Sequence, residues 1–215
     1  MAKLTHLETQ EIISDIYVLN TKNANFYIIK NESRYIAIDA GGGSRKRIEA
    51  ELNKLSIDPE KITTVLLTHT DFDHLAGLNL FKNATIYISR EEVQMINGSV
   101  ARMFGFFKNK LNVNYKVIKN NKIIHFSKIK VKGILTPGHT NGSMCYLVDD
   151  KYLFTGDNLS LYDGQVDLFN SLFNMDDDVQ RKSIKKLARI KGAEYIFTSH
   201  HGFSDNYTGA FGKFE

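Results

Sequence analysis

Four side chains of the types that bind metal ions lie within one short stretch of this sequence: His69, Asp71, Asp73 and His74. The stretch directly follows the apolar run 65–67, which is typical of a buried strand. Imidazole and carboxylate groups at this density would be costly to desolvate in an ordinary protein core. One or two divalent cations would satisfy all four groups together, so the stretch predicts a metal site.

Further ligand-type residues follow three other apolar, strand-like runs, which end at positions 136, 155 and 198. They are, in chain order, His139, Asp157 and the adjacent pair His200 and His201. In layered α/β proteins, sites are built on the loops that follow the carboxyl ends of strands. A single His or Asp is more often structural, but an ordered set after four strand-like runs favours one shared site.

These residues and their order resemble the metallo-β-lactamase superfamily. Its signature T-H-x-H-x-D-H-x-x-G is matched by the stretch 68–77, and its G-H-T, T-G-D and H-G segments are matched at 138–140, 155–157 and 201–202. The resemblance implies an α/β fold, a four-layer αββα sandwich, in which residues 1–215 form a single metallo-β-lactamase-like domain. It also implies a site for one or two metal ions at one edge of the sandwich.

The resemblance implies that almost every residue of the pattern is a metal ligand. The first metal position would be held by His69, Asp71 and His139, and the second by Asp73, His74 and His201, with Asp157 bridging both. His201 is preferred to His200 because the family ligand directly precedes Gly. His200 is then expected in a supporting role or in contact with substrate.

Two further residues are candidates for roles around the ligands. Asp39 matches a family position that supports the metal ligands, although an Asp that only forms a turn is an equally good interpretation. Tyr162 follows the bridging Asp157 closely and is a candidate substrate contact, with ordinary loop chemistry as the alternative.

Asp71 departs from the signature, which has His at this place. Two divalent cations (+4) and the carboxylates of Asp71, Asp73 and Asp157 (−3) leave +1, whereas His at position 71 would leave +2. The smaller residual charge weakens the Lewis acidity of the metal, and an oxygen ligand favours harder metals. The expected cofactors are two divalent metal ions, with zinc, iron and manganese all open.

The function that the resemblance implies is a dinuclear metal-dependent hydrolase. A metal-bound hydroxide would attack an ester-type bond in a thioester, lactone or phosphodiester. Asp73 and Asp157 would be the catalytic carboxylates that orient the nucleophile and return a proton to the leaving group. Two alternatives remain open: a diiron oxidoreductase of the flavodiiron-like branch, and a non-catalytic metal-binding or sensing module.

The elements that must position these residues can be outlined from apolar patterns. Strands are expected at 16–19, 25–30, 35–39, 85–89 and 144–148. Helices are expected at 44–55, with Ser44 as N-cap, at 91–96, and at 176–191. Residues 98–116 mix aromatic residues with Gly and Lys, which favours a core helix, with a lid over the pocket as the alternative.

Composition narrows the class of protein. The 215 residues are 42% apolar, and the net charge of +4 does not suggest a nucleic-acid partner. One Cys, no signal peptide and no long apolar run favour a cytoplasmic protein without a membrane contact.

Residues 94–147 contain Lys and Arg but no Asp or Glu. A solvated basic face explains this stretch most simply, and attraction of an anionic small-molecule substrate is the alternative. The sequence does not indicate an oligomeric state.

Overall fold

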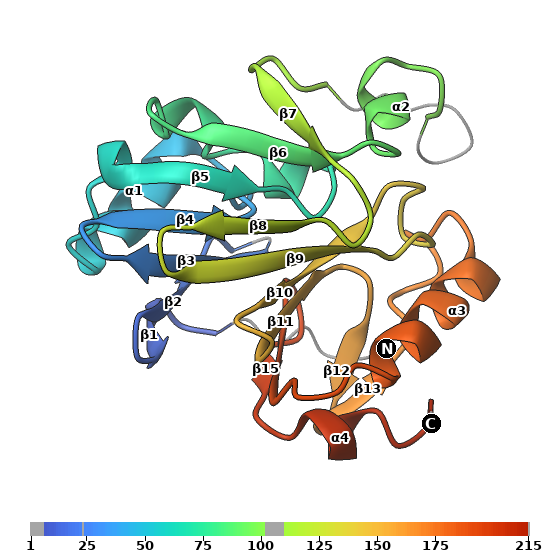
Figure 1. Ribbon diagram of the computed structural model, residues 1–215. Coiled ribbons are helices and arrows are strands. Elements are labelled where there is room, and N and C mark those ends of the chain that lie inside the picture. The colour runs from blue at the N-terminus through green and yellow to red at the C-terminus, as the bar shows by residue number, and fades with distance from the viewer. Residues whose placement is uncertain (1–6, 23, 102–109, 215) are drawn as a thin grey trace.

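The computed structural model describes residues 7–22, 24–101 and 110–214, and two mixed β-sheets form its centre (Figure 1). The strands of the first sheet lie in the order β1 (Gln10–Ile13), β2 (Ile16–Asn20), β3 (Asn25–Asn31), β4 (Arg34–Ile38), β5 (Ile62–Leu66), β6 (Thr85–Ser89) and β7 (Tyr115–Ile118). Strands β1 to β4 pair antiparallel, and β4 to β7 pair parallel.

The strands of the second sheet lie in the order β15 (Phe203–Ser204), β14 (Tyr195–Thr198), β11 (Tyr152–Gly156), β10 (Met144–Val148), β9 (Ile129–Leu135) and β8 (Ile123–Phe126). Strands β11 and β14 are parallel, and the other neighbours are antiparallel. A separate hairpin is formed by β12 (Ser160–Tyr162) and β13 (Gln165–Asp167).

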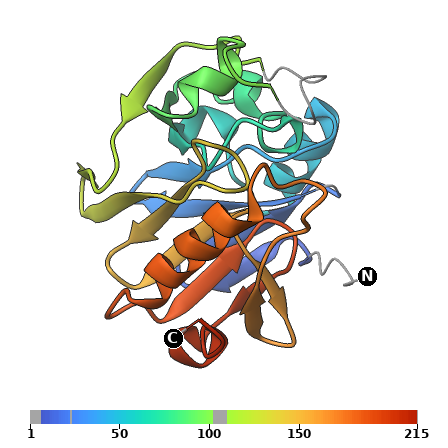
Figure 2. The same ribbon diagram turned by 90° about the vertical axis from the view of Figure 1, so that its right-hand side faces the viewer.

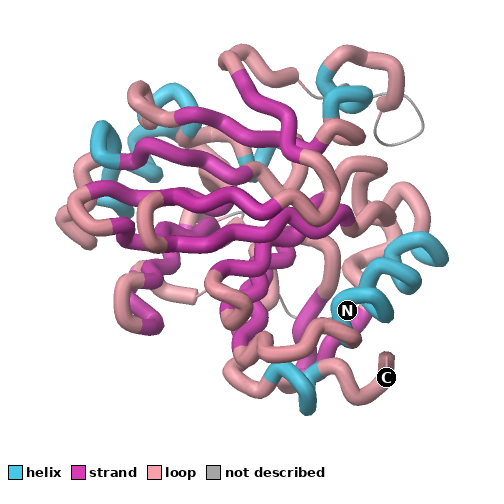
Figure 3. Tube along the Cα trace, viewed as in Figure 1, coloured by secondary structure: helices cyan, strands magenta, loops and turns pink. Residues whose placement is uncertain are grey.

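Helices cover the outside of the two sheets, as the cyan segments around the magenta strands show (Figure 3). The α-helices are α1 (Arg45–Lys54), α2 (Val93–Ile96), α3 (Asp177–Ala188) and α4 (Tyr207–Ala210), and the 3-10 helices are η1 (Pro59–Lys61), η2 (Phe72–His74) and η3 (Leu78–Leu80). The side chains of Ser44 and Asp176 cap α1 and α3 by accepting hydrogen bonds from backbone N–H groups.

Three apolar cores hold these layers together. Ile48 and Leu52 of α1 pack on the outer face of the first sheet, and Ile184 and Leu187 of α3 pack on the outer face of the second. A core between the sheets includes Tyr146 of β10, which is completely buried. Figure 2 shows α3 lying across the second sheet. The order helix, sheet, sheet, helix confirms the predicted αββα sandwich.

Most elements expected from the sequence are present, with shifted ends. The expected strand at 85–89 is β6. The helix expected at 176–191 ends at Ala188, and the chain then turns through Gly192, whose φ of +89° is a left-handed conformation. A core helix was expected over residues 98–116, but the described residues 98–101 and 110–114 are not helical, and β7 begins at Tyr115. Leu111 and Val113 pack against the outer core of the first sheet, while residues 102–109 lie outside the described residues.

No helix within the described ranges has the length and apolar character needed to cross a membrane.

Candidate metal centre

The candidate ligands converge at one edge of the sandwich. The strands β4, β5, β11 and β14 all end there, followed by Asp39, the 68–74 segment, Asp157 and the 199–202 turn. The loop after β9 brings His139 to the same edge. Parallel strands β4 and β5 in one sheet and β11 and β14 in the other direct their carboxyl ends to the same side, which explains why residues distant in sequence meet here.

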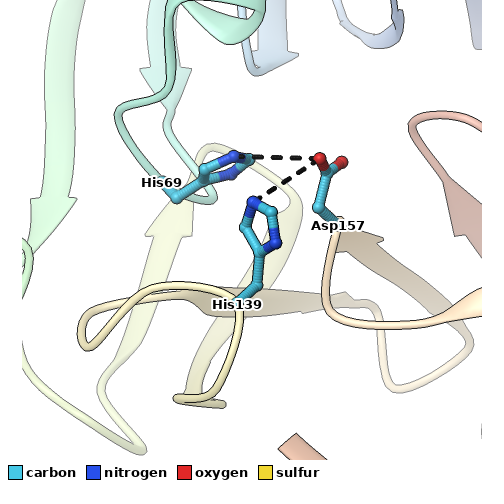
Figure 4. Close-up of side chains that lie close together, drawn as sticks. All are labelled: His69, His139 and Asp157. Carbon is cyan, nitrogen blue, oxygen red and sulfur yellow. Dashed lines mark ion pairs between the residues drawn. The ribbon is translucent and has the colours of Figure 1, made fainter. Parts of the chain in front are cut away.

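The first group consists of His69, Asp71, His139 and Asp157. His139 Nε2 lies 3.3 Å from Asp71 Oδ2 and 3.6 Å from Asp157 Oδ2. His69 Nε2 lies 3.6 Å from Asp71 Oδ2 and 4.0 Å from Asp157 Oδ2. Figure 4 shows both imidazole rings directed at the Asp157 carboxylate. Asp71 thus lies beside His69 and His139, in the group that the family resemblance implied for it.

The second group consists of Asp73, His74, His200 and again Asp157. His74 Nε2 lies 3.4 Å from Asp157 Oδ1 and 3.9 Å from Asp73 Oδ1. His200 Nε2 lies 3.2 Å from Asp157 Oδ2 and 3.6 Å from Asp73 Oδ2. Asp157 lies in both groups, which is the position that the family resemblance implied for it.

The family resemblance implied His201 in the second group, whereas the structure places His200 there. The turn after β14 is fixed by a hydrogen bond of 2.9 Å from the His201 backbone N–H to Thr198 Oγ1. His200 then faces the carboxylates, and the His201 ring packs against Tyr162, with 5.0 Å between ring centroids. Tyr162, predicted as a substrate contact, thus lies beside His201.

The two groups have the same composition, two imidazoles and two carboxylates each, and their geometry fits a metal ion. Four ligands placed tetrahedrally about 2.05 Å from a zinc ion are separated by about 3.3 Å. The distances between ligand atoms given above run from 3.2 to 4.0 Å. Three buried atoms, His69 Nε2, His74 Nε2 and Asp157 Oδ1, have no hydrogen-bond partner among the described residues. A divalent cation in each group would satisfy them.

The charges in the cluster also favour a bound metal cation. Burial and then the neighbouring His74 lower the pKa of His69 well below its usual value, which favours the neutral, ligating form. At His74, burial acts in the same direction but is outweighed by Asp157, Asp39 and Asp73, so its pKa is raised well above the usual value. Without a metal ion the buried carboxylates thus require a proton on His74, and a metal cation would supply that positive charge instead.

Asp39, for which the family resemblance implied a supporting role and a turn-forming role was the alternative, fixes two of the candidate ligands. Its Oδ2 lies 2.9 Å from His74 Nδ1, so that this nitrogen carries the proton and Nε2 faces the second group. Thr68 Oγ1 donates its only proton to Asp39 Oδ2 at 2.8 Å. His69 Nδ1, 3.0 Å from the same hydroxyl, must therefore donate to it, which leaves His69 Nε2 free for a metal.

Comparison with known proteins assigns this chain to a family. The sequence pattern of the Metallo-beta-lactamase superfamily matches residues 19–200. The chain belongs to this superfamily. A probable metallo-hydrolase of Methanocaldococcus jannaschii is 30% identical over 151 residues, which cover 70% of this chain and 63% of that protein. A hydroxyacylglutathione hydrolase of Dictyostelium discoideum is 28% identical over 172 residues, which cover 74% of this chain and 59% of that protein.

A solved structure has the same fold as this chain. A B3 metallo-β-lactamase described as having an active-site glutamic acid has a TM-score of 0.73, with 98% of this chain and 90% of that chain covered. Its sequence identity of 17% means that the likeness shows the shared fold alone. The chain spans less than two thirds of the length of the two curated relatives named above.

Beyond the superfamily pattern, Glu92 braces two of the ligand loops. Its Oε1 accepts hydrogen bonds from the backbone N–H and the hydroxyl of Thr70, and its Oε2 accepts one from the Thr140 hydroxyl. Thr70 lies between His69 and Asp71. Burial raises the pKa of Glu92 to about 7, although hydrogen bonds from both threonines oppose the shift. Nothing local in the sequence marks this residue, because its partners are far away along the chain.

The solvent-facing side of the centre is formed by carboxylates. The side chains of Asp71 and Asp73 are 15% and 17% exposed, whereas those of His69, His74 and His139 are at most 1% exposed. Phe169 covers another side, with its ring 5.1 Å from that of His139 and 5.6 Å from that of His200. A substrate would therefore approach past the two aspartates.

Proposed function

We propose that this protein is a metal-dependent hydrolase that binds two divalent ions and cleaves an ester-type bond. The observation that carries the proposal is the convergence of four histidines and three aspartates on one edge, with three buried ligand atoms that lack a hydrogen bond within the described chain. One ion would be held by His69, Asp71 and His139, the other by Asp73, His74 and His200, and both by Asp157. Membership of the superfamily and the hydrolase relatives support the same function.

Bound divalent ions would supply Lewis acidity and activate a water molecule near neutral pH. Asp73 is exposed enough to contact a substrate, and its Oδ1 or Oδ2 can return a proton to the leaving group. Asp157, which is nearly buried between the two groups, holds its carboxylate in one orientation against His74 and His200. Phe169 keeps water from the face of the site formed by His139 and His200.

Within this class, a thioester or ester with an apolar acyl group is the substrate favoured by the surroundings of the site. Phe72, between Asp71 and Asp73, is 79% exposed. Leu172 and Phe173 are 78% and 48% exposed on the loop that also carries Phe169. Phe72 lies between two candidate ligands, so its exposed ring is available to contact an apolar acyl group. The Dictyostelium relative is named a hydroxyacylglutathione hydrolase. In hydroxyacylglutathione the acyl group is joined through a thioester.

Hydrolysis of a panel of acyl thioesters, lactones and phosphodiesters tests the proposed function. We expect activity on acyl thioesters or esters that is abolished by a chelator, restored by a divalent metal and lost in Asp157→Asn. The matched control is Asp163→Asn, the same change at an exposed turn residue with a φ of +49°. Absence of activity on the whole panel by a metal-loaded protein would contradict the proposal and favour the sensing module.

The alternative diiron oxidoreductase is favoured by one observation, the replacement of an imidazole by the Asp71 carboxylate in the first group. Two imidazoles with carboxylates form a donor set that also suits iron. Iron in the protein as purified, together with an optical change on reduction, would support this alternative. Zinc or manganese without such a change would support hydrolysis.

A further inference from the structure

A buried glutamine on α3 connects the helix to the ligand loops. Gln180 is 0% exposed and lies on the side of α3 that faces the loop after β9. The helix approaches this loop so closely that a Cβ at Gly138 would lie 2.4 Å from the backbone of Gln180. Gly138 directly precedes His139, so the contact places Gln180 near a predicted metal ligand.

The orientation of the Gln180 side-chain amide is fixed by a backbone group. The N–H of Phe169 donates to Gln180 Oε1 at 3.1 Å, and a backbone N–H can only donate. The oxygen of the amide must therefore face Phe169. Its Nε2 then faces Asn174 Oδ1 at 2.9 Å and the backbone carbonyl of Asp157 at 3.4 Å.

The orientation of Asn174 follows from that of Gln180. Asn174 Nδ2 donates to Gln180 Oε1 at 2.8 Å, to the Phe169 carbonyl at 3.1 Å and to Asp177 Oδ1 at 2.7 Å. All three partners are acceptors, so the nitrogen of the amide must face them. Asn174 Oδ1 is thereby directed at His139 Nδ1, which lies 3.2 Å away.

This chain of hydrogen bonds determines which tautomer the neutral imidazole of His139 adopts. Because Asn174 Oδ1 can only accept, His139 Nδ1 must carry the proton. His139 Nε2 then has a lone pair, and it faces Asp71 and Asp157 in the first metal group. The backbone N–H of Phe169 thus sets the tautomer of His139 through two amides.

We propose that Gln180 is a positioning residue for the metal centre, acting through Asn174 on His139 and through the backbone carbonyl on Asp157. Gln180 fixes the ring orientation and tautomer of His139, as Asp39 fixes those of His69 and His74. It does so from a helix on the other side of the site. The inference rests on the metal centre of the proposed function, but the tautomer of His139 is also a property of the metal-free protein.

Zinc binding provides the first test, in competition with a chromophoric chelator. Gln180→Met keeps the length of the side chain and removes its hydrogen bonds. We expect zinc affinity at the first group, which contains His139, to fall by roughly 10- to 100-fold, the usual effect of losing a partner behind a ligand. The matched control is Ser183→Ala, which removes the 2.7 Å hydrogen bond from α3 to the Pro137 carbonyl on the same loop. Ser183→Ala should bind zinc as the wild type does.

Nitrogen-15 NMR of the imidazoles in metal-free protein provides the second test, with His139 assigned by comparison with His139→Asn. We expect the Nδ1-protonated tautomer in the wild type and a mixture of tautomers in Gln180→Met. If that variant does not fold, Asn174→Ala serves instead and should give the same mixture. An unchanged tautomer together with unchanged zinc affinity would overturn the inference. A wild type that binds no zinc would refute the proposed function, while the NMR result would still decide the role of Gln180.

Discussion

His200 Nε2 lies 3.2 Å from Asp157 Oδ2, whereas the ring of the next residue, His201, packs against Tyr162. We therefore expect His200→Ala to lose one equivalent of metal per chain, because the second group would keep only His74 as an imidazole ligand. His201→Ala is the matched control and should keep both equivalents. Metal analysis after dialysis distinguishes the two variants. Loss of metal in His201→Ala with retention in His200→Ala would restore the assignment made from the sequence.

Asp39→Asn should weaken the metal centre without disturbing the backbone. Asp39 has a φ of +64°, a left-handed conformation that Asn also adopts readily. Asp39 Oδ2 accepts from His74 Nδ1 and the Thr68 hydroxyl, and Oδ1 accepts from the Thr68 backbone N–H. An amide nitrogen in either place cannot accept, so Asn loses at least one of these hydrogen bonds. We expect metal affinity to fall by roughly 10- to 100-fold. Wild-type affinity in a folded Asp39→Asn protein would show that these hydrogen bonds do not control the ligands.

Glu92 should make the metal-free protein less stable as the pH rises toward neutrality. Its pKa is about 7 in the folded protein, above the ordinary value of 4.5 for Glu that applies in the unfolded chain. Between these values the folded state binds more protons than the unfolded state, so the free energy of unfolding falls as pH increases. Glu92→Gln lacks this titration and can keep the hydrogen bonds to Thr70 and Thr140.

We accordingly expect the free energy of unfolding of metal-free Glu92→Gln to exceed that of the wild type at pH 8 by on the order of 1–3 kcal/mol. The two proteins should be equally stable near pH 4.5, as measured by urea unfolding. A variant that is less stable than the wild type at pH 8 would mean that the charged carboxylate stabilises these loops.

Phe72→Ser should impair hydrolysis of substrates with long apolar acyl groups. The side chain is exposed between two aspartates of the centre, so its removal costs little in folding but takes away apolar contact with substrate. We expect KM to rise by up to about tenfold for a long-chain acyl thioester and to stay unchanged for the acetyl thioester. Equal effects on both substrates would argue against an acyl-binding role.

The sequence could predict the parts of the site that are encoded locally. His69, Asp71, Asp73 and His74 share one loop, and their positions relative to each other follow from η2 and the end of β5. The αββα sandwich could be predicted because the whole ordered pattern resembles one superfamily. The strands β12 and β13 were not predicted, since their short polar segments have little apolar alternation of their own.

The remaining features depend on contacts between distant segments. His200 and His201 are adjacent, and which of them faces Asp157 is decided by the hydrogen bond to Thr198 within the turn. Glu92 reaches Thr140, which is 48 residues away. Gln180 acts on His139 only because α3 packs against the loop at Gly138. A single sequence carries no pattern that pairs such residues.

The metal content of the purified wild-type protein, measured by inductively coupled plasma mass spectrometry after exhaustive dialysis against metal-free buffer, tests the metal centre most directly. We expect two equivalents of divalent metal per chain, and about one or fewer in Asp157→Asn, because Asp157 serves both groups. A wild-type protein that retains no metal, and takes up none when zinc, iron or manganese is supplied before dialysis, would contradict the metal centre. The proposed ligands are His69, Asp71, Asp73, His74, His139, Asp157 and His200.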